Sequence, residues 1–421
     1  IETIGDDEMS NIVEATGVGC GFLDYDGDGL LDIYLVNGCW KQGVSDPAID
    51  PAKRAKFAAA TDRLYRNRGD GTFEDATTRA GVAKVGYGMG VTVADYDADG
   101  DPDIYVTNHG PNFLYRNNGD GTFTEVAEQA GVADPNFSVG AVFLDYDRDG
   151  WLDLYVGNYI TYVPAAVKPH DPNAVRSPLA YEGQQDRLYR GNGDGTFTDV
   201  TRKAGLEIKP VGRAMGVGTL DYDADGWVDI FVSNDAMENF LWHNRGDGTF
   251  ENTALLAGVA FGQSGDATAA MAVEVGDYNG DGRFDILVPD MNGGCLYRNV
   301  GGGMFEDVAI RSGISPAMIR YHSWGGAFAD FDLDGDLDVY ITNGSACRFE
   351  AQPDGLFAND GRGRFSLVPT DGQAPRPTTQ SATQPVATQP ATTQPFPCFV
   401  GRGVARGDFD DLPGAGKPIP D

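Results

Sequence analysis

The segment Asp95 to Asp103 reads DYDADGDPD, and the same nine-residue pattern, D-x-D/N-x-D-G-x-x-D, occurs six times in the 421-residue chain. A seventh start, at Asp408 (DFDDLPGAG), soon departs from the pattern. Successive starts are 71, 50, 76, 56, 53 and 78 residues apart, so the basic unit is about 50 residues and three intervals carry insertions. Units of this length are typical of propeller blades, whereas a parallel β-helix, the rival architecture, has repeats of about nine residues. The complete copies begin at Asp24, Asp95, Asp145, Asp221, Asp277 and Asp330.

Each unit contains four short strand-like segments in a constant order. In the second unit, Gly90 to Tyr96 leads into the acidic loop, Asp103 to Thr107 leaves it, Phe113 to Asn117 reaches the turn Asn118 to Gly121, and Thr122 to Ala127 closes the unit. Short apolar runs bounded by Gly, Asp and Asn turns are typical of antiparallel hairpins. The sequence therefore predicts an all-β protein, a β-propeller of six complete four-stranded blades with a calcium loop each, plus a partial seventh repeat.

The composition divides the chain into four parts. We predict an N-terminal lead-in (1–17), the propeller (18–369), a Thr/Gln/Pro-rich linker (370–397) and a C-terminal segment with the partial seventh repeat (398–421). A Thr/Gln/Pro-rich stretch buries too little apolar surface to form a core, which indicates an extended spacer. The first residue is Ile, which is consistent with a removed signal peptide or with an incomplete start.

The repeated loops carry the residues that calcium requires. Side-chain oxygens at positions 1, 3, 5 and 9, with the main-chain carbonyl at position 7, supply the five or more hard oxygens that Ca²⁺ prefers, whereas Mg²⁺ favours a small octahedron with retained water. We predict about six calcium ions and assign no catalytic or cofactor-binding residue. The expected ligands are Asp24, Asp26, Asp28, Leu30, Asp32, Asp95, Asp97, Asp99, Asp101, Asp103, Asp145, Asp147, Asp149, Trp151, Asp153, Asp221, Asp223, Asp225, Trp227, Asp229, Asp277, Asn279, Asp281, Arg283, Asp285, Asp330, Asp332, Asp334, Asp336 and Asp338.

An EF-hand is the alternative interpretation of these loops. Its twelfth position carries a bidentate Glu. The chain has an aliphatic residue there in all six copies, so we expect the loop to connect two strands. The six residues are Leu35, Val106, Val156, Val232, Val288 and Ile341.

These motifs carry a family resemblance. Ile12 to Gly38 (IVEATGVGCGFLDYDGDGLLDIYLVNG) and Leu114 to Val126 (LYRNNGDGTFTEV) resemble the FG-GAP/VCBS calcium-loop propellers, specifically the bacterial branch similar to cartilage acidic protein. The resemblance covers Gly17 to about Pro369 and implies a secreted, extracellular or cell-surface protein. Many such proteins finish a seventh blade and add an ASPIC/UnbV module, whereas here the seventh loop breaks at Leu412 and Pro413 and no such module follows.

Charge narrows the range of partners. The formal net charge is −32, which repels phosphate backbones, so we exclude nucleic acid as a partner. No apolar run reaches the ~18 to 20 residues that span a bilayer, so we predict no membrane insertion.

Three further features invite a functional interpretation. Arg-Gly-Asp occurs at Arg68 to Asp70, Arg245 to Asp247 and Arg406 to Asp408, but sister turns read NGD, so we interpret Arg as a variable turn residue. We interpret His109, His322 and Trp324 as packing or turn residues rather than ligands of the central mouth. Cys295 and Cys347, both expected in the connection after a second strand, are the predicted disulfide.

The strand order predicts where a partner binds. Strands one and three run toward the face of the acidic loops, so the connections from strand two to three and from strand four to the next blade share the other face. The insertions Cys39 to Thr61 and Tyr159 to Gln185 lie in such connections. Because inserted loops on a rigid scaffold commonly carry function, we expect a protein or glycan partner there.

Two classes of function remain open. The first is a structural, adhesive or protein-binding module that self-assembles into a homo-oligomer, chain or fibre through its C-terminal strand. The second is a carbohydrate-active enzyme, a polysaccharide lyase or hydrolase with carboxylates and Arg or Tyr on the insertion face. No Ser/His/Asp set, HExxH motif or phosphate-cradling loop is present, which favours the first.

Overall fold

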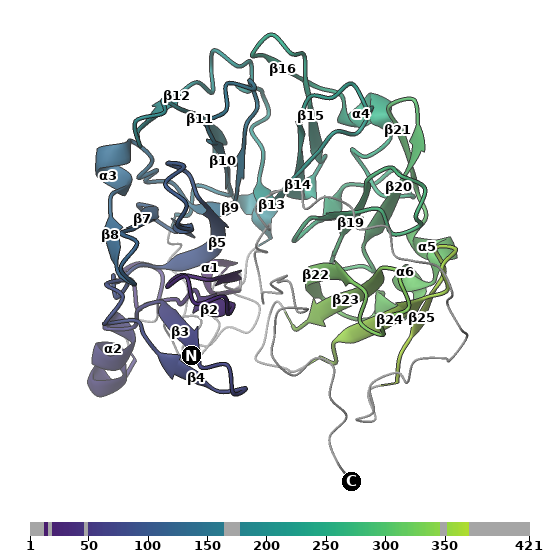
Figure 1. Cartoon of the computed structure of the whole chain (residues 1–421). Helices are drawn as coiled ribbons and strands as arrows, with labels where there is room; N and C mark the ends of the chain where they lie inside the picture. The colour runs from purple at the N-terminus through teal and green to yellow at the C-terminus, as the bar shows by residue number, and fades with distance from the viewer. Residues whose placement is uncertain (1–11, 16–18, 46–48, 164–176, 346–351, 370–421) are drawn as a thin grey trace.

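The computed structural model describes residues 12–15, 19–45, 49–163, 177–345 and 352–369. These residues form six four-stranded antiparallel sheets, which are the blades of a β-propeller (Figure 1). Every blade uses four strands that are consecutive in sequence, so the chain completes one blade before it starts the next. The predicted six-bladed, all-β propeller is confirmed, while the linker and the partial seventh repeat lie outside the described residues.

The blades share one order, in which the first strand is innermost and the fourth is outermost. An additional short strand, β17 (Thr268–Ala269), pairs with β14 of blade 4. The strands are β1 Cys20–Leu23, β2 Asp32–Leu35, β3 Arg63–Asn67 and β4 Phe73–Asp75 in blade 1; β5 Gly88–Ala94, β6 Asp103–Asn108, β7 Phe113–Asn117 and β8 Phe123–Glu125 in blade 2; β9 Ser138–Leu144, β10 Asp153–Asn158, β11 Arg187–Gly191 and β12 Phe197–Asp199 in blade 3; β13 Ala214–Leu220, β14 Asp229–Met237, β15 Phe240–Asn244 and β16 Phe250–Asn252 in blade 4; β18 Glu274–Gly276, β19 Asp285–Val288, β20 Cys295–Gly301 and β21 Met304–Asp307 in blade 5; and β22 Ser323–Ala329, β23 Asp338–Asn343, β24 Gly355–Asn359 and β25 Phe365–Leu367 in blade 6.

Short helical segments occur only between strands or before the first blade in the part of the chain that the structure describes. The longest, α2, has eight residues and lies in the first insertion, where the Asp50 side chain caps its N-terminus. The segments are α1 Ile12–Ala15, α2 Pro51–Ala58, α3 Ala127–Ala130, η1 Pro178–Ala180, α4 Ala254–Ala257, α5 Ala309–Ser312 and α6 Ile314–Met318.

Strand bounds in blade 2 differ from the prediction at the acidic loop. The first strand, β5, ends at Ala94 rather than Tyr96. The reason is that the Tyr96 N–H donates to the Asp103 carboxylate at 3.1 Å, which makes Tyr96 part of the loop. The third strand, β7, has the predicted bounds.

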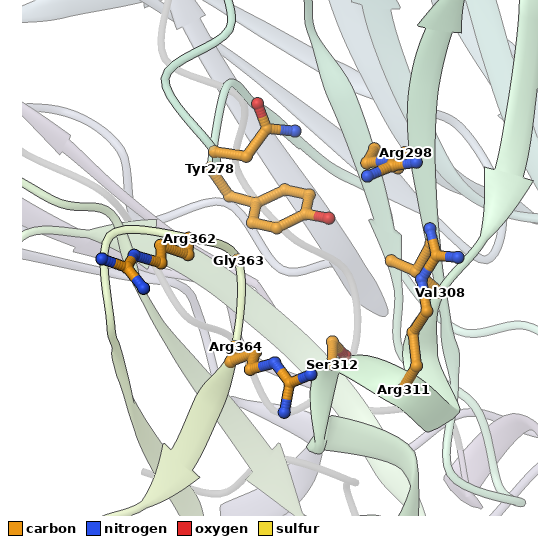
Figure 2. A pocket seen from close by; sticks show the side chains of 9 residues that line it. Tyr278, Arg298, Val308, Arg311, Ser312, Arg362, Gly363 and Arg364 are labelled. Atoms are coloured by element: carbon orange, nitrogen blue, oxygen red, sulfur yellow. The ribbon is translucent and has the colours of Figure 1, made fainter.

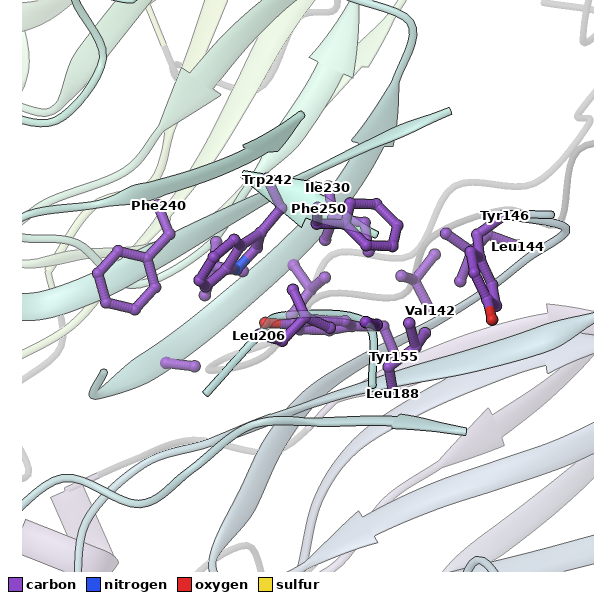
Figure 3. Close-up of a cluster of buried hydrophobic side chains, with 14 of the residues drawn as sticks. Val142, Leu144, Tyr146, Tyr155, Leu188, Leu206, Ile230, Phe240, Trp242 and Phe250 are labelled. Atoms are coloured by element: carbon purple, nitrogen blue, oxygen red, sulfur yellow. The ribbon is translucent and has the colours of Figure 1, made fainter. Parts of the chain in front are cut away.

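Contacts between aromatic rings join consecutive blades. The Tyr at position 2 of each of the first five acidic loops packs on the Phe that follows the GDG-type turn of the next blade, with ring centroids 5.6–6.1 Å apart. Such pairs stabilise a fold beyond the area that they bury. Figure 3 shows Tyr146 and Phe250 in the buried cluster between blades 3 and 4. The five pairs are Tyr25–Phe123, Tyr96–Phe197, Tyr146–Phe250, Tyr222–Phe305 and Tyr278–Phe365.

An asparagine at the end of the third strand adds a hydrogen bond across four of these interfaces. Its side-chain amide donates to the carbonyl of the stacked Tyr in the preceding blade at 2.8–3.0 Å. Blade 3 has Gly191 at this position and so lacks the bond. The donors are Asn117, Asn244, Asn299 and Asn359.

The centre of the ring is closed by a hydrophobic cluster at the insertion-bearing end. It combines the starts of inner strands, such as Met89 and Val139, with Ile12 and Val13 of α1 and with Tyr159 of the second insertion. This end therefore holds the connections from strand two to three, as the strand order predicts.

The junction between blades 6 and 1 is built differently. Phe331, at position 2 of the sixth loop, is 42% exposed and packs near Tyr340 of its own blade. Phe73, which follows the turn of blade 1, is 41% exposed. Within the described residues, the Asn67 amide donates to Leu31 of its own blade and makes no bond to blade 6. Among the described residues, blades 6 and 1 thus lack the Tyr–Phe contact and the Asn hydrogen bond that join other neighbouring blades.

Candidate functional site

Each acidic loop is held by hydrogen bonds between its own residues. In blade 2, the Asp95 carboxylate accepts from the N–H groups of Asp99 at 3.0 Å and Gly100 at 2.9 Å. The Asp99 carboxylate accepts from the Asp101 N–H at 3.0 Å. The same three bonds recur in the other five loops. Positions 1 and 5 therefore shape the turn.

The aspartate at position 9 begins the second strand and is buried. The Asp103 carboxylate accepts from the N–H groups of Tyr96 at 3.1 Å and Asn117 at 2.7 Å. Burial, together with the charges of Asp97 and Asp99, raises the pKa of Asp103 to about 8. Burial likewise raises the pKa of its counterparts in the first, third, fourth and fifth loops to about 7, and that of the sixth is also raised. These residues are Asp32, Asp153, Asp229, Asp285 and Asp338.

The aspartate at position 3 has, in most loops, an oxygen for which the described residues provide no donor. In four loops its Oδ1 atom is buried and has no hydrogen-bond partner. A buried carboxylate oxygen without a partner is costly, so this atom fits a cation as its missing contact. The four residues are Asp26, Asp97, Asp147 and Asp332.

Several of the predicted ligands come together as candidate metal clusters. Their ligand atoms lie within 4.8 Å of one another in each group. The acidic clusters could therefore hold metal ions, while the full ligand sets and the position-7 carbonyls stay predictions. The groups include Asp24–Asp26–Asp32, Asp95–Asp97–Asp99, Asp145–Asp147–Asp153 and Asp221–Asp223–Asp229.

The fifth loop is bonded differently. The Asn279 amide donates to Asp285 at 3.3 Å, and its carbonyl oxygen accepts from the Asp281 N–H at 3.0 Å. Arg283 donates to Asp281 at 2.6 Å. The fifth loop therefore lacks the carboxylate that other loops have at position 3. The guanidinium of its own Arg283 supplies a positive charge there.

A third-strand residue that the sequence analysis missed faces the loops. Arg66 contacts Asp26 and Asp28, and Arg190 Nε donates to Asp147 Oδ2 at 2.7 Å. In both loops the guanidinium contacts Oδ2 of position 3 and leaves Oδ1 directed elsewhere. The signal was present, because a basic residue recurs directly before the end of strand three.

The fourth loop has a histidine at this third-strand position. His243 Nδ1 lies 3.3 Å from Asp229 and 3.6 Å from Asp223. With Asp223 and Asp225 it forms a further group of possible metal ligands. No pattern in the sequence marked His243 as a candidate ligand.

A second polar group lies at the insertion-bearing end, where Tyr159 is 1% and Asp235 4% exposed. The Tyr159 hydroxyl donates to Asp235 Oδ2 at 2.5 Å, and Arg213 donates to the Tyr181 carbonyl at 3.3 Å. The Tyr181 ring lies 5.7 Å from that of Tyr162. Burial raises the pKa of Asp235 to about 6, and the positive charge of Arg213 opposes the shift. Aromatic, acidic and basic side chains thus meet beside the second insertion.

The histidine and tryptophan noted in the sequence are packing residues. The His109 ring lies edge-on to Phe137 at 4.7 Å, and burial lowers its pKa to about 3. Trp324 lies within β22, is 2% exposed and donates from Nε1 to the Gly344 carbonyl at 2.7 Å. The His322 N–H donates to Gln352 at 2.9 Å.

The described Arg-Gly-Asp copies are hairpin turns. Arg68 pairs with Glu74 at 2.8 Å, and Arg245 pairs with Glu251 at 2.5 Å, both across the turn. The third copy, 406–408, lies outside the described residues. The structure supports the interpretation of Arg as a turn residue.

The predicted disulfide is not supported. Cys295 is a free, buried thiol and opens β20 rather than lying in the connection before it. Cys347 lies outside the described residues.

Among the described residues, no helix has the length and apolar character needed to cross a membrane.

Comparisons with known proteins agree with this architecture. The profile of the FG-GAP-like repeat family matches residues 24–106, 95–156, 179–232, 221–288 and 277–341. Cartilage acidic protein 1 of Mus musculus is 31% identical over 338 residues, covering 78% of this chain and 40% of that protein. The Homo sapiens protein is 28% identical over the same share of this chain and 39% of its own length. The chain thus spans about two fifths of these curated relatives.

Solved structures show more distant likeness. An Agrocybe aegerita lectin described as recognising non-reducing terminal N-acetylglucosamine is 18% identical, with a TM-score of 0.47, over 83% of this chain and 79% of the lectin. The exotype rhamnogalacturonan lyase YesX is 15% identical, with a TM-score of 0.40, over 84% of this chain and 56% of the lyase. Both similarities are too low to bear on what this chain binds.

Proposed function

The chain belongs to the FG-GAP-like repeat family, and we propose that it is a secreted, calcium-stabilised propeller that acts as a structural, adhesive or protein-binding module. The partnerless Oδ1 atom at position 3 supports calcium most directly, because backbone donors already serve positions 1, 5 and 9. Calcium takes six to eight oxygen ligands in flexible geometry, which suits carboxylates of a tight loop. Six divalent ions would offset twelve of the 32 net negative charges.

Residues of this chain would hold the calcium ion in each loop. Positions 1 and 5 close the turn. Position 9 accepts from the N–H of position 2 and from the N–H of the residue that ends the third strand, as Asp32 does in blade 1. Arg66 and Arg190 orient position 3 in their loops. A bound ion would neutralise carboxylates that the fold brings within a few ångströms, and binding to the native state alone adds stability by mass action.

Metal removal tests the calcium proposal. We expect EDTA to lower the melting temperature substantially, added Ca²⁺ to restore it, and Mg²⁺ to restore less. Elemental analysis should find about six calcium ions per chain. Asp145→Ala should reduce the calcium count and the melting temperature, whereas Glu128→Ala, which changes an exposed acid on α3, should change neither. An identical melting curve in EDTA, without bound calcium, would refute the assignment.

We place the partner, a protein or a glycan, at the insertion-bearing end. Tyr162 and Tyr181, with rings 5.7 Å apart beside Arg213, support this placement, because aromatic and guanidinium groups are enriched at binding surfaces. Screening protein and glycan partners should yield a ligand that Tyr181→Ala weakens at least ~10-fold, a loss of about 1.4 kcal/mol. Trp151→Ala, on the opposite face, serves as the matched control. Equal loss in both variants contradicts the placement.

The contact between Tyr159 and Asp235 favours a second candidate, a polysaccharide lyase or hydrolase. A hydroxyl hydrogen-bonded to a buried carboxylate beside an arginine is a possible acid–base pair. An activity on a polysaccharide panel that Tyr159→Phe and Asp235→Asn both abolish would support catalysis. A panel without turnover leaves the binding module as the function.

Self-assembly through the C-terminal segment is part of the proposal. Residues 370–421 lie outside the described chain, and the junction between blades 6 and 1, with exposed Phe73 and Phe331, is the surface that supports docking there. The segment could add a strand to its own ring or to a neighbouring molecule. Deleting 370–421 should abolish association in light scattering if the segment links molecules, and unchanged association would exclude it.

A further inference from the structure

The interface between blades 5 and 6 holds a pocket rich in arginine. Its volume is about 160 Å³, and its walls come from the fifth loop (Tyr278, Asn279), the third strand of blade 5, the short helix α5 and the GDG-type turn of blade 6. Figure 2 shows the guanidinium groups of Arg298 and Arg311 on one side and that of Arg364 approaching Ser312 on another. Arg362 also belongs to the lining, with its head group directed away in this view.

The equivalent pocket between blades 2 and 3 has a different composition. It has a volume of about 270 Å³ and is lined by Asp97, Asp99, Arg116 and Gln129, together with the turn Asp194 to Thr196. At matching places, blade 5 has Asn279 for Asp97 and Arg311 for Gln129. The turn of blade 6 has Arg362 for Asp194 and Arg364 for Thr196. Four substitutions from three separate segments therefore move one interface from acidic to basic.

The arginines at this interface are incompletely neutralised. In blades 1 and 3 the third-strand arginine is paired with its own loop, as Arg190 is with Asp147 at 2.7 Å. Here Arg298 contacts Glu306 at 3.2 Å, and Arg311 contacts the same carboxylate at 2.6 Å. One carboxylate thus serves two guanidinium groups.

The turn of blade 6 adds two more positive charges. Arg362 and Arg364 are exposed, and neither has an ion pair within the described part of the chain. Their main-chain N–H groups donate to Asp360 at 3.0 and 3.1 Å, which holds the turn that presents them. In a chain of net charge −32 this is a local excess of positive charge.

We propose that this pocket binds a tetrahedral oxyanion, a sulfate or phosphate group, either free or as an ester on a glycan. Guanidinium groups match the geometry of such oxygens through paired N–H donors and are poorly replaced by other side chains. Arg298 and Arg311 reach the pocket from one blade and Arg364 from the next, so one small anion contacts both blades. The Tyr278 hydroxyl supplies a neutral donor in the same wall, whereas the Ser312 hydroxyl already donates to the Ala309 carbonyl at 3.0 Å.

Titration of the calcium-loaded full chain with inorganic sulfate at constant ionic strength tests the proposal. We expect saturable binding of one sulfate per chain by calorimetry. Arg364→Gln should weaken it at least ~10-fold, because the guanidinium is exposed and its loss leaves the fold intact. Glu306→Gln should strengthen it several-fold, because it releases Arg298 and Arg311. Arg245→Gln, in the turn of blade 4, should leave it unchanged.

Arg364→Gln should weaken sulfate binding, whereas Glu306→Gln should strengthen it. These opposite effects distinguish a direct role in binding from a general disturbance of packing. Absence of saturable binding, or equal affinity of the native chain and Arg364→Gln, overturns the proposal. A sulfated monosaccharide that binds at least ~10-fold more tightly than inorganic sulfate identifies a glycan ester as the source, and equal affinities identify the free anion; both outcomes support the oxyanion site.

Discussion

The interface between blades 3 and 4 and the junction between blades 6 and 1 use the same two sequence positions with different results. In the first, the Tyr146 ring of the acidic loop packs on that of Phe250 with centroids 5.7 Å apart, and both side chains are buried. In the second, the corresponding residues Phe331 and Phe73 are each about two fifths exposed. Every blade carries an aromatic residue in its acidic loop on one side and a Phe after its turn on the other. These side chains are buried only where they face a neighbouring blade.

This difference identifies the junction between blades 6 and 1 as the place where the stability of the ring depends on other parts of the chain or on a partner. Blades 1 to 6 are joined by stacking and, at four interfaces, by an Asn amide, so they support one another in series. In the described residues, the sides of blades 6 and 1 that face each other carry the same motif without the aromatic contact or the Asn hydrogen bond. Four predictions test the comparison, from the largest expected effect to the smallest.

Truncating the buried member of the stack should have the largest effect. Phe250→Ala removes a ring that is 4% exposed, so we expect a loss of about 3 to 5 kcal/mol in the free energy of unfolding. Phe73→Ala, the same motif position in blade 1, should cost under ~1 kcal/mol because exposed side chains contribute little. Chemical denaturation of both variants measures the difference. Equal losses would mean that Phe73 is buried against another part of the chain in solution.

The buried loop carboxylates predict an unusual pH dependence for the metal-free chain. The folded-state pKa of Asp103 is about 8 and that of Asp32 about 7, both above the ordinary value of 3.8. The folded state therefore holds protons that the unfolded state releases, so stability is greatest at low pH and is lost as pH rises through about 7 to 8. We expect a fall of at least about 2 kcal/mol between pH 5 and pH 8 in EDTA.

Calcium should reverse this trend. A bound ion favours the ionised carboxylates, so the stability gained from calcium should grow as pH rises from 5 to 8. Thermal melts at four pH values, with EDTA and with calcium, measure how the melting temperature changes with pH in each condition. Parallel slopes in the two conditions would contradict a role for the position-9 aspartates in metal binding.

The asparagine bond should contribute less than the stack. Asn244 donates to Tyr146 of the preceding blade at 2.8 Å and to Val228 of its own blade at 3.1 Å. Asn67 has the own-blade bond, to Leu31 at 3.1 Å. Asn244→Ala should therefore destabilise the chain by about 1 kcal/mol more than Asn67→Ala, which is the usual net contribution of one hydrogen bond. Denaturant midpoints that agree within error for the two variants would show that the inter-blade bond contributes nothing.

The smallest effect concerns the fourth position of the loops, where the backbone is left-handed in all six copies. Leu333 has φ of 59° and is 74% exposed. Left-handed conformations cost an ordinary residue about 1 to 2 kcal/mol, and Gly adopts them freely at some entropic cost. Leu333→Gly should thus stabilise the chain by up to ~1 kcal/mol, and Ala98→Gly, in a loop between joined blades, should do the same. A loss of stability in Leu333→Gly alone would indicate that its side chain is covered at the junction.

Local patterns explain what could be predicted from the sequence. The acidic loop closes through hydrogen bonds within nine residues, such as that from Gly100 to Asp95, so its spacing predicted both the turn and the grouped carboxylates. Position 12 excluded an EF-hand because it carries an aliphatic residue in place of Glu, and Val106 at that position lies inside β6. Strand bounds were less certain, since Tyr96 is drawn into the loop by Asp103, a residue seven positions later.

Contacts between distant segments could not be predicted in this way. His243 joins the fourth loop from a strand that begins after it, and the arginine pocket combines segments that are up to 86 residues apart, from Tyr278 to Arg364. A turn residue such as Arg364 has no pattern of its own that places it beside Arg311.

The sequence by itself determined the repeat, the six four-stranded blades and the acidic loops, because each of these is encoded by neighbouring residues whose spacing matches one strand or one turn. Only the tertiary structure decided which copies of the repeated motif are buried, which basic residues face which loop, and where positive charge accumulates in an acidic protein. The physical reason is that these properties depend on the packing of one blade against the next. Residues about 50 or more positions apart meet there, and identical motifs such as those of Phe73 and Phe250 acquire different surroundings.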